Sequence, residues 1–221
     1  MRHARIIVPG ANYHVTHRGN RKHLVFFDDA DREHYCHWLD FHAAMNDLAI
    51  LAFALMPNHV HLVVRPEASG SLARTIREAH SRHAVWINRR HGWSGHLWAN
   101  RFYSTVLDED HLRNAIRYVE MNPVRAGIVA RAENYAWSSA AQHCGLPSAA
   151  EIQVSPSPLP EVQDWSDWLR LGALSDDEVA LRRNTYAGKP TGSREFISCL
   201  ESMLARRIQP RQRGRPRKSS K

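Results

Sequence analysis

Apolar and polar residues follow a strand-like pattern in four short stretches of the chain. Residues 12–17 alternate between the two classes, and an apolar run at 48–55 is followed, after the tight connection 56–58, by a second apolar run that ends at Arg65. A fourth stretch of this kind lies at 102–107. The second and third stretches are so close in sequence that we expect them to form an antiparallel hairpin.

Between these stretches, apolar residues recur every three or four positions, as they do on one face of a helix. One helix is predicted from an N-cap at Asp31 to about Met45, a second starts with Ser71 as its cap, and a third runs from 108–110 to about Met121. The buried faces expected for the first two helices consist of Tyr35, Trp38, Leu39, His42 and Met45, and of Leu72, Ile76, Ala79, His83 and Trp86.

The resulting order, β-α-β-β-α-β with one more helix, predicts a ferredoxin-like α+β sandwich, in which a four-stranded antiparallel sheet carries helices on one face. This domain is expected to occupy residues 1–145, and the Ser-, Pro- and Ala-rich segment 146–160 is interpreted as a linker. A helical extension at 161–207 and a disordered basic tail at 208–221 would follow. Short helices are expected in the extension at 165–171, 176–186 and 196–207.

The chain carries a formal net charge of +8, and this charge is concentrated at its C-terminal end. Residues 201–221 hold eight Lys or Arg and one Glu, which is a net charge of +7, so the remaining residues together carry only +1. A basic tail of this kind usually binds a polyanion, most often nucleic acid.

Cysteine usage and hydropathy indicate a cytoplasmic protein. Cys36, Cys144 and Cys199 lie far apart and form no Cys-x-x-Cys pair, which fits a reducing cytosol and argues against a cysteine zinc site. No signal-peptide pattern is visible at the N-terminus, and the longest apolar run, 48–57, is too short to cross a bilayer. We therefore expect no membrane partner, and the basic tail favours association with the nucleoid.

Two histidines, His59 and His61, interrupt the third strand. Because side chains alternate along a strand, both imidazoles should lie on one face of the sheet, well placed to share a metal ion. A further pair lies on the third helix, where Tyr118 and Asn122 are one turn apart and share a face, and Pro123 then ends or bends the helix. Neither pair is informative alone, because the chain has 15 histidines and a helical tyrosine is more often a core residue.

The ordered set of motifs is far more specific than any of its members, and it resembles the single-tyrosine (Y1) HUH transposases of the IS200/IS605 type, most of all the branch called REP-associated tyrosine transposases. The resemblance is strong over about residues 5–145 and looser beyond them. It is carried by Tyr13-His14-Val15 with Arg18-Gly19, by Met56-Pro57-Asn58-His59-Val60-His61-Leu62, by Gly95-His96-Leu97-Trp98 with Arg101-Phe102, by residues 118–127, and by Gly214-Arg215-Pro216-Arg217-Lys218.

This resemblance implies a nuclease and strand transferase for single-stranded DNA, with residues 1–145 as its catalytic domain. His59 and His61 match the paired metal-binding histidines, Tyr118 the nucleophile that forms a 5′-phosphotyrosine intermediate, and Asn122 the third metal ligand. The implied metal is Mg²⁺ or Mn²⁺. Insertion-sequence relatives have Gln where this chain has the shorter Asn122, which would alter the metal distance and preference.

The resemblance also implies hairpin-forming DNA, such as REP-like palindromes, as the partner, with no small-molecule substrate, and a monomer rather than a dimer that exchanges tyrosine helices. Candidate phosphate contacts are Arg18, Arg21, Lys22 and Arg101. Trp98 is a candidate for stacking on an unpaired base, with a core position as its alternative. In the tail, Arg213, Arg215, Arg217 and Lys218 form either an AT-hook-like minor-groove contact or a non-specific phosphate-binding segment.

Two other functions stay open from the sequence. One is a non-catalytic DNA-binding regulator that derives from a transposase, which retained metal-dependent cleavage would exclude. The other is a metallo-phosphohydrolase that uses His59 and His61 with water as nucleophile, which would form no protein–DNA adduct and would remain active without the Tyr118 hydroxyl.

Overall fold

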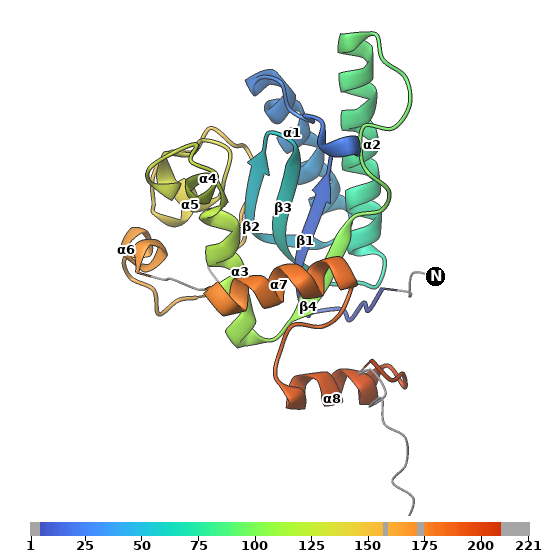
Figure 1. Ribbon diagram of the computed structural model, residues 1–221, viewed down its shortest axis with the longest axis vertical. Helices are drawn as coiled ribbons and strands as arrows, with labels where there is room; N and C mark the ends of the chain where they lie inside the picture. Colours follow the sequence, from blue (N-terminus) through green and yellow to red (C-terminus); the bar gives the residue numbers. More distant parts are fainter. Residues whose placement is uncertain (1–4, 157–158, 172–174, 209–221) are drawn as a thin grey trace, which may run out of the picture.

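Four strands form one antiparallel sheet in the computed structural model, which describes residues 5–156, 159–171 and 175–208 (Figure 1). The strands are β1 (Asn12–Arg18), β2 (Leu48–Met56), β3 (His59–Pro66) and β4 (Tyr103–Leu107), in the order β2-β3-β1-β4. Met56 pairs with His59 across a two-residue turn, so the predicted hairpin of β2 and β3 is confirmed. The predicted α+β class with a four-stranded antiparallel sheet is confirmed as well.

Helices α1 (Asp29–Met45) and α2 (Ser71–His91) cover one face of the sheet. Their buried residues join one hydrophobic core with the side chains that alternate toward them from the strands, such as Val15, Val60 and Leu62. The opposite positions of the same strands, such as Val63, belong to a second core. Each strand therefore buries both of its faces, which is why β2 reads as a continuous apolar run.

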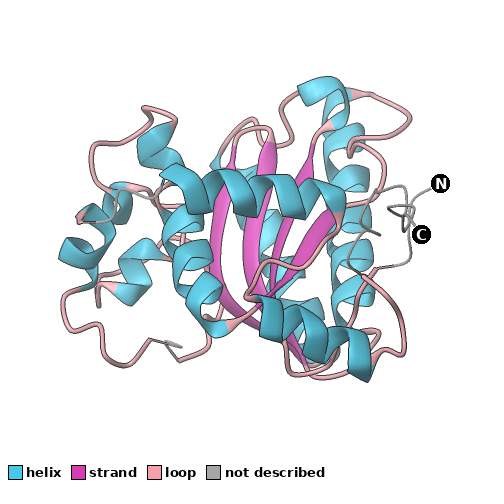
Figure 2. Cartoon of the chain, turned by 60° about the horizontal axis from the view of Figure 1, so that its bottom comes forward, coloured by secondary structure: helices cyan, strands magenta, loops and turns pink. Residues whose placement is uncertain are grey.

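The second core lies beneath α3 (Glu109–Glu120) and α7 (Ser175–Ala187), which cover the face opposite to α1 and α2 (Figures 1 and 2). The sequence placed helices on one face only, so the molecule has a third layer that the pattern did not indicate. The C-terminal extension contributes to this layer, since Leu181 of α7 is buried among residues of α3 and the sheet.

The predicted helix starts need small corrections. The side chain of Asp28, not Asp31, caps α1 by accepting from the backbone N–H of Asp31. Asp31 is fully buried, and its carboxylate accepts from the indole N–H of Trp86 at 2.9 Å and from Arg90. Ser71 begins α2 but does not cap it by its side chain, because the cap position belongs to Gly70.

Other elements surround this core. They are the short 3₁₀ helices η1 (Asn20–Lys22) and η2 (Ala132–Asn134), and the helices α4 (Asn122–Arg125), α5 (Ala140–His143), α6 (Trp165–Arg170) and α8 (Arg194–Met203). The described part of segment 146–160 has no helix or strand, yet its Ala150, Ile152 and Leu159 are buried in the two cores. The tail residues 209–221 lie outside the described residues. Among the described residues, no helix has the length and hydropathy needed to span a membrane.

Candidate functional site

His59 and His61 lie on the sheet face that α3 and α7 cover. Their ring centroids are 4.9 Å apart, with the rings almost perpendicular to each other. The Nδ1 atom of His59 is 2.6 Å from the side-chain oxygen of Asn58, and a carbonyl oxygen can only accept, so this nitrogen donates. The Nε2 atom of His59 is then left with its lone pair.

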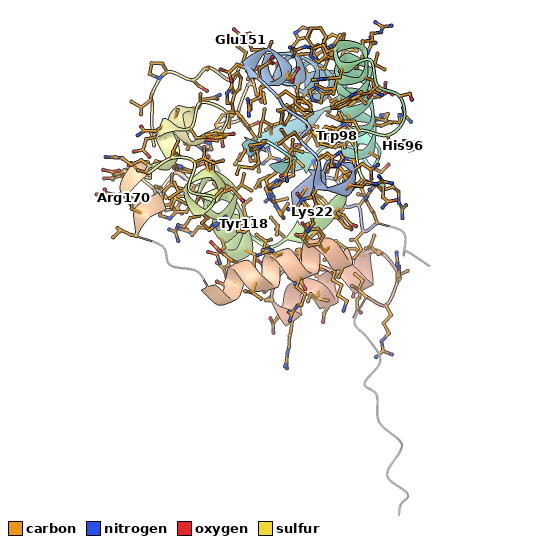
Figure 3. The ribbon with its side chains drawn as sticks, turned by 45° about the horizontal axis from the view of Figure 1, so that its top comes forward. Lys22, His96, Trp98, Tyr118, Glu151 and Arg170 are labelled. Carbon is orange, nitrogen blue, oxygen red and sulfur yellow. The ribbon has the colours of Figure 1, made fainter. Side chains whose placement is uncertain are left out.

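Tyr118 projects from α3 toward this histidine pair, and Figure 3 shows it where α3 approaches α7. Its ring makes an edge contact with His61, with the centroids 5.4 Å apart, and a similar contact with His14 at 5.6 Å. Only 6% of Tyr118 is exposed. The structure therefore brings Tyr118 and His61 together.

His14 is part of this site, although no role for it is indicated by the sequence. It lies on β1, and its Nε2 atom is 2.9 Å from Nδ1 of His61. Its other nitrogen, Nδ1, is 2.8 Å from the hydroxyl of Thr185 on α7. Alternation along β1 could have indicated the sheet face on which His14 lies. Its contacts could not be predicted, because the pairing of β1 with β3 and the packing of α7 depend on distant parts of the chain.

Tyr118 lies on α3, and Asn122 and Arg125 follow it on α4. The amide nitrogen of Asn122 donates to the Tyr118 carbonyl at 2.9 Å, which leaves its side-chain oxygen available. Arg125 lies over the Tyr118 ring, 4.3 Å from its centroid, and is held there by Glu178 of α7 at 2.6 Å. A cation is therefore fixed beside the phenol.

Burial controls the protonation of these side chains. It lowers the pKa of His14 to about 3 and, together with the charge of Arg18, the pKa of His59 to about 4; the pKa of His61 also falls well below its ordinary value. All three imidazoles are therefore neutral near pH 7. Burial raises the pKa of Tyr118, against the lowering effect of Arg125 and Arg182, so its hydroxyl keeps its proton at that pH.

The donor atoms that remain are suited to a divalent metal. They are Nε2 of His59, Nε2 of His61 and the side-chain oxygen of Asn122, all neutral. Among the described residues, no group of three or more His, Cys, Asp and Glu is arranged to hold a metal. Two imidazole nitrogens and one amide oxygen form a neutral ligand set that can bind a divalent metal such as Mn²⁺, which accepts imidazole more readily than Mg²⁺ does.

The basic loop after β1 is connected to this site. Arg21 and Lys22 are exposed and adopt left-handed backbone angles, with φ of 52° and 65°. The amide nitrogen of Asn58 donates to the Lys22 carbonyl at 3.2 Å, and Asn58 also orients His59. Arg18 lies opposite His59 in the sheet, and its buried Nε atom has no hydrogen-bond partner among the described residues.

The other two candidate contacts differ from each other. Trp98 is 8% exposed, stacks on His80 with centroids 4.1 Å apart, and donates its indole N–H to the His80 carbonyl, so it is a core residue and not an accessible base platform. Arg101 is exposed and borders a cavity of about 70 Å³ at the C-terminal end of α7. The four tail residues from Arg213 to Lys218 lie outside the described residues.

Comparison with protein-family models matches residues 7–122 to the family described as "Transposase IS200 like". The matched segment is more than half of the 221 residues and ends at Asn122. It contains His14, His59, His61 and Tyr118, whereas α7 lies beyond it. A comparison with curated proteins gave no match.

The solved structures that match the chain include two of transposases. One is a REP-associated tyrosine transposase bound to a REP hairpin, with a TM-score of 0.56 and 18% identity over 72% of this chain and 95% of that one. The other, from Deinococcus radiodurans R1 and named a transposase, has a TM-score of 0.38 and 22% identity over 54% of this chain and 96% of that one. The first similarity supports the fold described above.

Proposed function

Because the chain belongs to the IS200-like transposase family, we propose that it is an endonuclease and strand transferase for single-stranded DNA that acts through a covalent bond to Tyr118. The observation that carries this proposal is the contact of the Tyr118 ring with His61, whose neighbour His59 offers a second free ring nitrogen. A phenol beside two neutral imidazoles is suited to metal-assisted transesterification.

In this proposal, His59, His61 and Asn122 hold Mg²⁺ or Mn²⁺. When bound, the metal supplies positive charge to the non-bridging oxygens of the scissile phosphate. Since all three donors are neutral, they leave the charge of the ion undiminished. Imidazole is a softer ligand than Mg²⁺ prefers, and Asn122 is shorter than Gln, so we expect Mn²⁺ to support the reaction at least as well as Mg²⁺.

Tyr118 carries out the exchange. Its oxygen forms a bond to phosphorus while the bond from phosphorus to the 3′ oxygen breaks, which gives a 5′-phosphotyrosine and a 3′ hydroxyl. The proton that Tyr118 loses is balanced by the proton that the 3′ oxygen gains. Burial makes loss of that proton costly, and the cations of Arg125 and Arg182 offset part of this cost. One phosphodiester replaces another, so a later 3′ hydroxyl can rejoin the strand without ATP.

We propose a hairpin stem with a flanking single strand, of the REP type, as the substrate. The REP-associated tyrosine transposase that this chain resembles was solved with a REP hairpin bound. Arg18 is suited to a phosphate because its buried Nε has no partner among the described residues, and Arg21 and Lys22 extend the positive charge outward. We also propose a monomer, as the resemblance to the REP-associated branch implies, rather than a dimer that exchanges tyrosine helices.

The proposal is tested with hairpins from repeats that flank the gene, labelled at either end and incubated with the protein and Mn²⁺. We expect a denaturing gel to show a protein-bound band that carries only the label 3′ of the cut, and His59→Ala to lose it. Hairpin binding with no cleavage of any repeat would favour the DNA-binding regulator instead.

The cavity beside Arg101 is our candidate for the path of the flanking strand. Its lining includes Arg5, Arg101 and Lys189 and, among the described residues, no acid, and the ring of Tyr186 borders it. A basic pocket with an aromatic wall is suited to a phosphate and an unpaired base. Thr185, which contacts His14, lines the same cavity, so the pocket adjoins the site.

Arg101→Gln is expected to weaken the binding of single-stranded DNA for all sequences alike and to reduce the slope of log K against log salt by about 0.7 to 1. Fluorescence anisotropy at several salt concentrations measures both quantities. Arg170→Gln removes an equal charge from α6, at the edge of the molecule opposite to β4 in Figure 1, and should change neither. Equal effects of the two variants would show that only net charge matters and that the cavity is not on the strand's path.

A further inference from the structure

Helix α7 reaches the site with a hydroxyl group. Thr185 is 1% exposed, and it lies under the helix with its side chain against His14. The family match ends at Asn122, so nothing in that match accounts for this contact. In Figures 1 and 2, α7 runs across the sheet face on which α3 lies.

The hydrogen bonds from α7 to His61 have only one consistent direction. The Thr185 hydroxyl lies 2.7 Å from the Leu181 carbonyl, and a carbonyl cannot donate, so the single hydroxyl proton is directed there. The same hydroxyl oxygen is 2.8 Å from Nδ1 of His14 and must therefore accept from it. Thr185 in this way places the proton of His14 on Nδ1.

The proton of His61 is assigned by the same reasoning. A neutral imidazole has one N–H, so Nε2 of His14 has no proton and can only accept. Its neighbour at 2.9 Å, Nδ1 of His61, must then be the donor. His61 is left with an unprotonated Nε2, which is the atom expected to bind the metal. Asn58 fixes the tautomer of His59 in the same way, through one hydrogen bond.

We propose that Thr185 and His14 are positioning residues that fix the tautomer and the ring orientation of His61, and that α7 is therefore a working part of the metal site. The inference rests on the proposed function for the role of His61 as a ligand. Partners of this kind, which hold a metal-binding histidine through its other nitrogen, typically change metal affinity or activity 10- to 100-fold when they are removed.

A purely structural role for the same contact makes a different prediction. If Thr185 only anchors α7, any side chain that fills its volume should serve, and the tautomer of His61 should not depend on the hydroxyl. Thr185→Val keeps the shape and removes the hydroxyl, whereas Thr185→Ser keeps the hydroxyl and removes a methyl group. The two variants therefore separate the roles.

The first readout is the tautomer in the metal-free protein, by ¹⁵N NMR of histidine-labelled samples with signals assigned through His14→Gln and His61→Gln. We expect the proton on Nδ1 of both residues in the wild type and in Thr185→Ser, and a mixture of tautomers in Thr185→Val. A proton on Nε2 of His61 in the wild type would overturn the proposal without the need for any variant.

The second readout is the dissociation constant of Mn²⁺ alone, from the EPR signal of unbound ion. We expect Thr185→Val to raise it about 10- to 100-fold and Thr185→Ser to leave it within about threefold. Thr191→Val is the matched control, because it removes another buried hydroxyl of the extension, one that lies 2.9 Å from Thr105. If Thr185→Ser or Thr191→Val raised the dissociation constant as much as Thr185→Val does, the contact of Thr185 with His14 would serve only packing.

These outcomes are separate from those of the proposed function. Both readouts are made without DNA, so they can support the role of Thr185 even if no hairpin is cut. Conversely, if the protein cuts hairpins but the tautomer of His61 is the same in the wild type and in Thr185→Val, the proposed function is supported and the inference is refuted.

Discussion

Tyr118→Phe is expected to abolish the covalent protein–DNA adduct and to lower the rate of hairpin cleavage by at least about 10³-fold. The variant lacks the only atom that can bond to phosphorus in the proposed reaction, and water would have to enter a position filled by a buried ring. The ring contacts with His14 and His61 are kept, so the fold and DNA binding should be unchanged. Single-turnover assays with labelled hairpins and Mn²⁺ measure the rate and the adduct together.

The contrast with His59→Ala makes this test specific. That variant keeps the Tyr118 hydroxyl but loses a proposed metal ligand, so excess Mn²⁺ should restore part of its activity, whereas no metal concentration should restore Tyr118→Phe. Cleavage that persists in Tyr118→Phe without an adduct would refute the tyrosine mechanism. It would favour the metallo-phosphohydrolase, in which His59 and His61 activate water.

The strand pattern predicted half of the site because a two-residue period is a local property. Alternation along β3 alone places His59 and His61 on one face and Val60 and Leu62 on the other. The structure agrees, because Val60 and Leu62 join the first core whereas the rings of His59 and His61 lie together beside Tyr118 of the second core. Helical spacing likewise predicted that Tyr118 and Asn122 lie one turn apart, and in the structure the Asn122 amide, at the start of α4, donates to the backbone carbonyl of Tyr118 on α3.

The remaining parts depend on packing between distant segments. His14 reaches His61 because β1 pairs with β3 in one register, and Thr185 reaches His14 from a helix 171 residues further along the chain. The α7 sequence has only a weak apolar face, so nothing in it indicated which side of the sheet it would cover. For Trp98 the sequence left base stacking and a core position open, and only the packing against His80 and the rest of the first core identifies the core position.

Glu120 is a second residue that only the packing identifies, and it lies on α3 between Tyr118 and Asn122. It is fully buried and accepts hydrogen bonds from Trp165 of α6 at 2.7 Å, from His143 of α5 at 2.6 Å and from Ser139. One carboxyl group thus attaches the helix of the proposed nucleophile to two segments that follow it in the chain.

Glu120→Ala is therefore expected to lower the free energy of unfolding by about 3–5 kcal/mol, because it leaves the partners of the carboxyl group buried and unpaired. Urea denaturation followed by circular dichroism measures this change. Glu120→Gln keeps the volume and one acceptor oxygen, so its loss should be smaller, about 1–3 kcal/mol. Glu109→Ala, at an exposed position of the same helix, should cost no more than about 1 kcal/mol.

The order of these three losses in the free energy of unfolding distinguishes two roles for Glu120. If Glu120 mainly fills space, Glu120→Gln should match the wild type; if it joins the helices through its hydrogen bonds, Glu120→Gln should fall between the wild type and Glu120→Ala. Since α3 also carries Tyr118, loss of this attachment should slow hairpin cleavage under conditions in which the variant is still folded. A Glu120→Ala protein as stable as Glu109→Ala would show that the packing of α3 on the sheet is sufficient to hold the nucleophile in place.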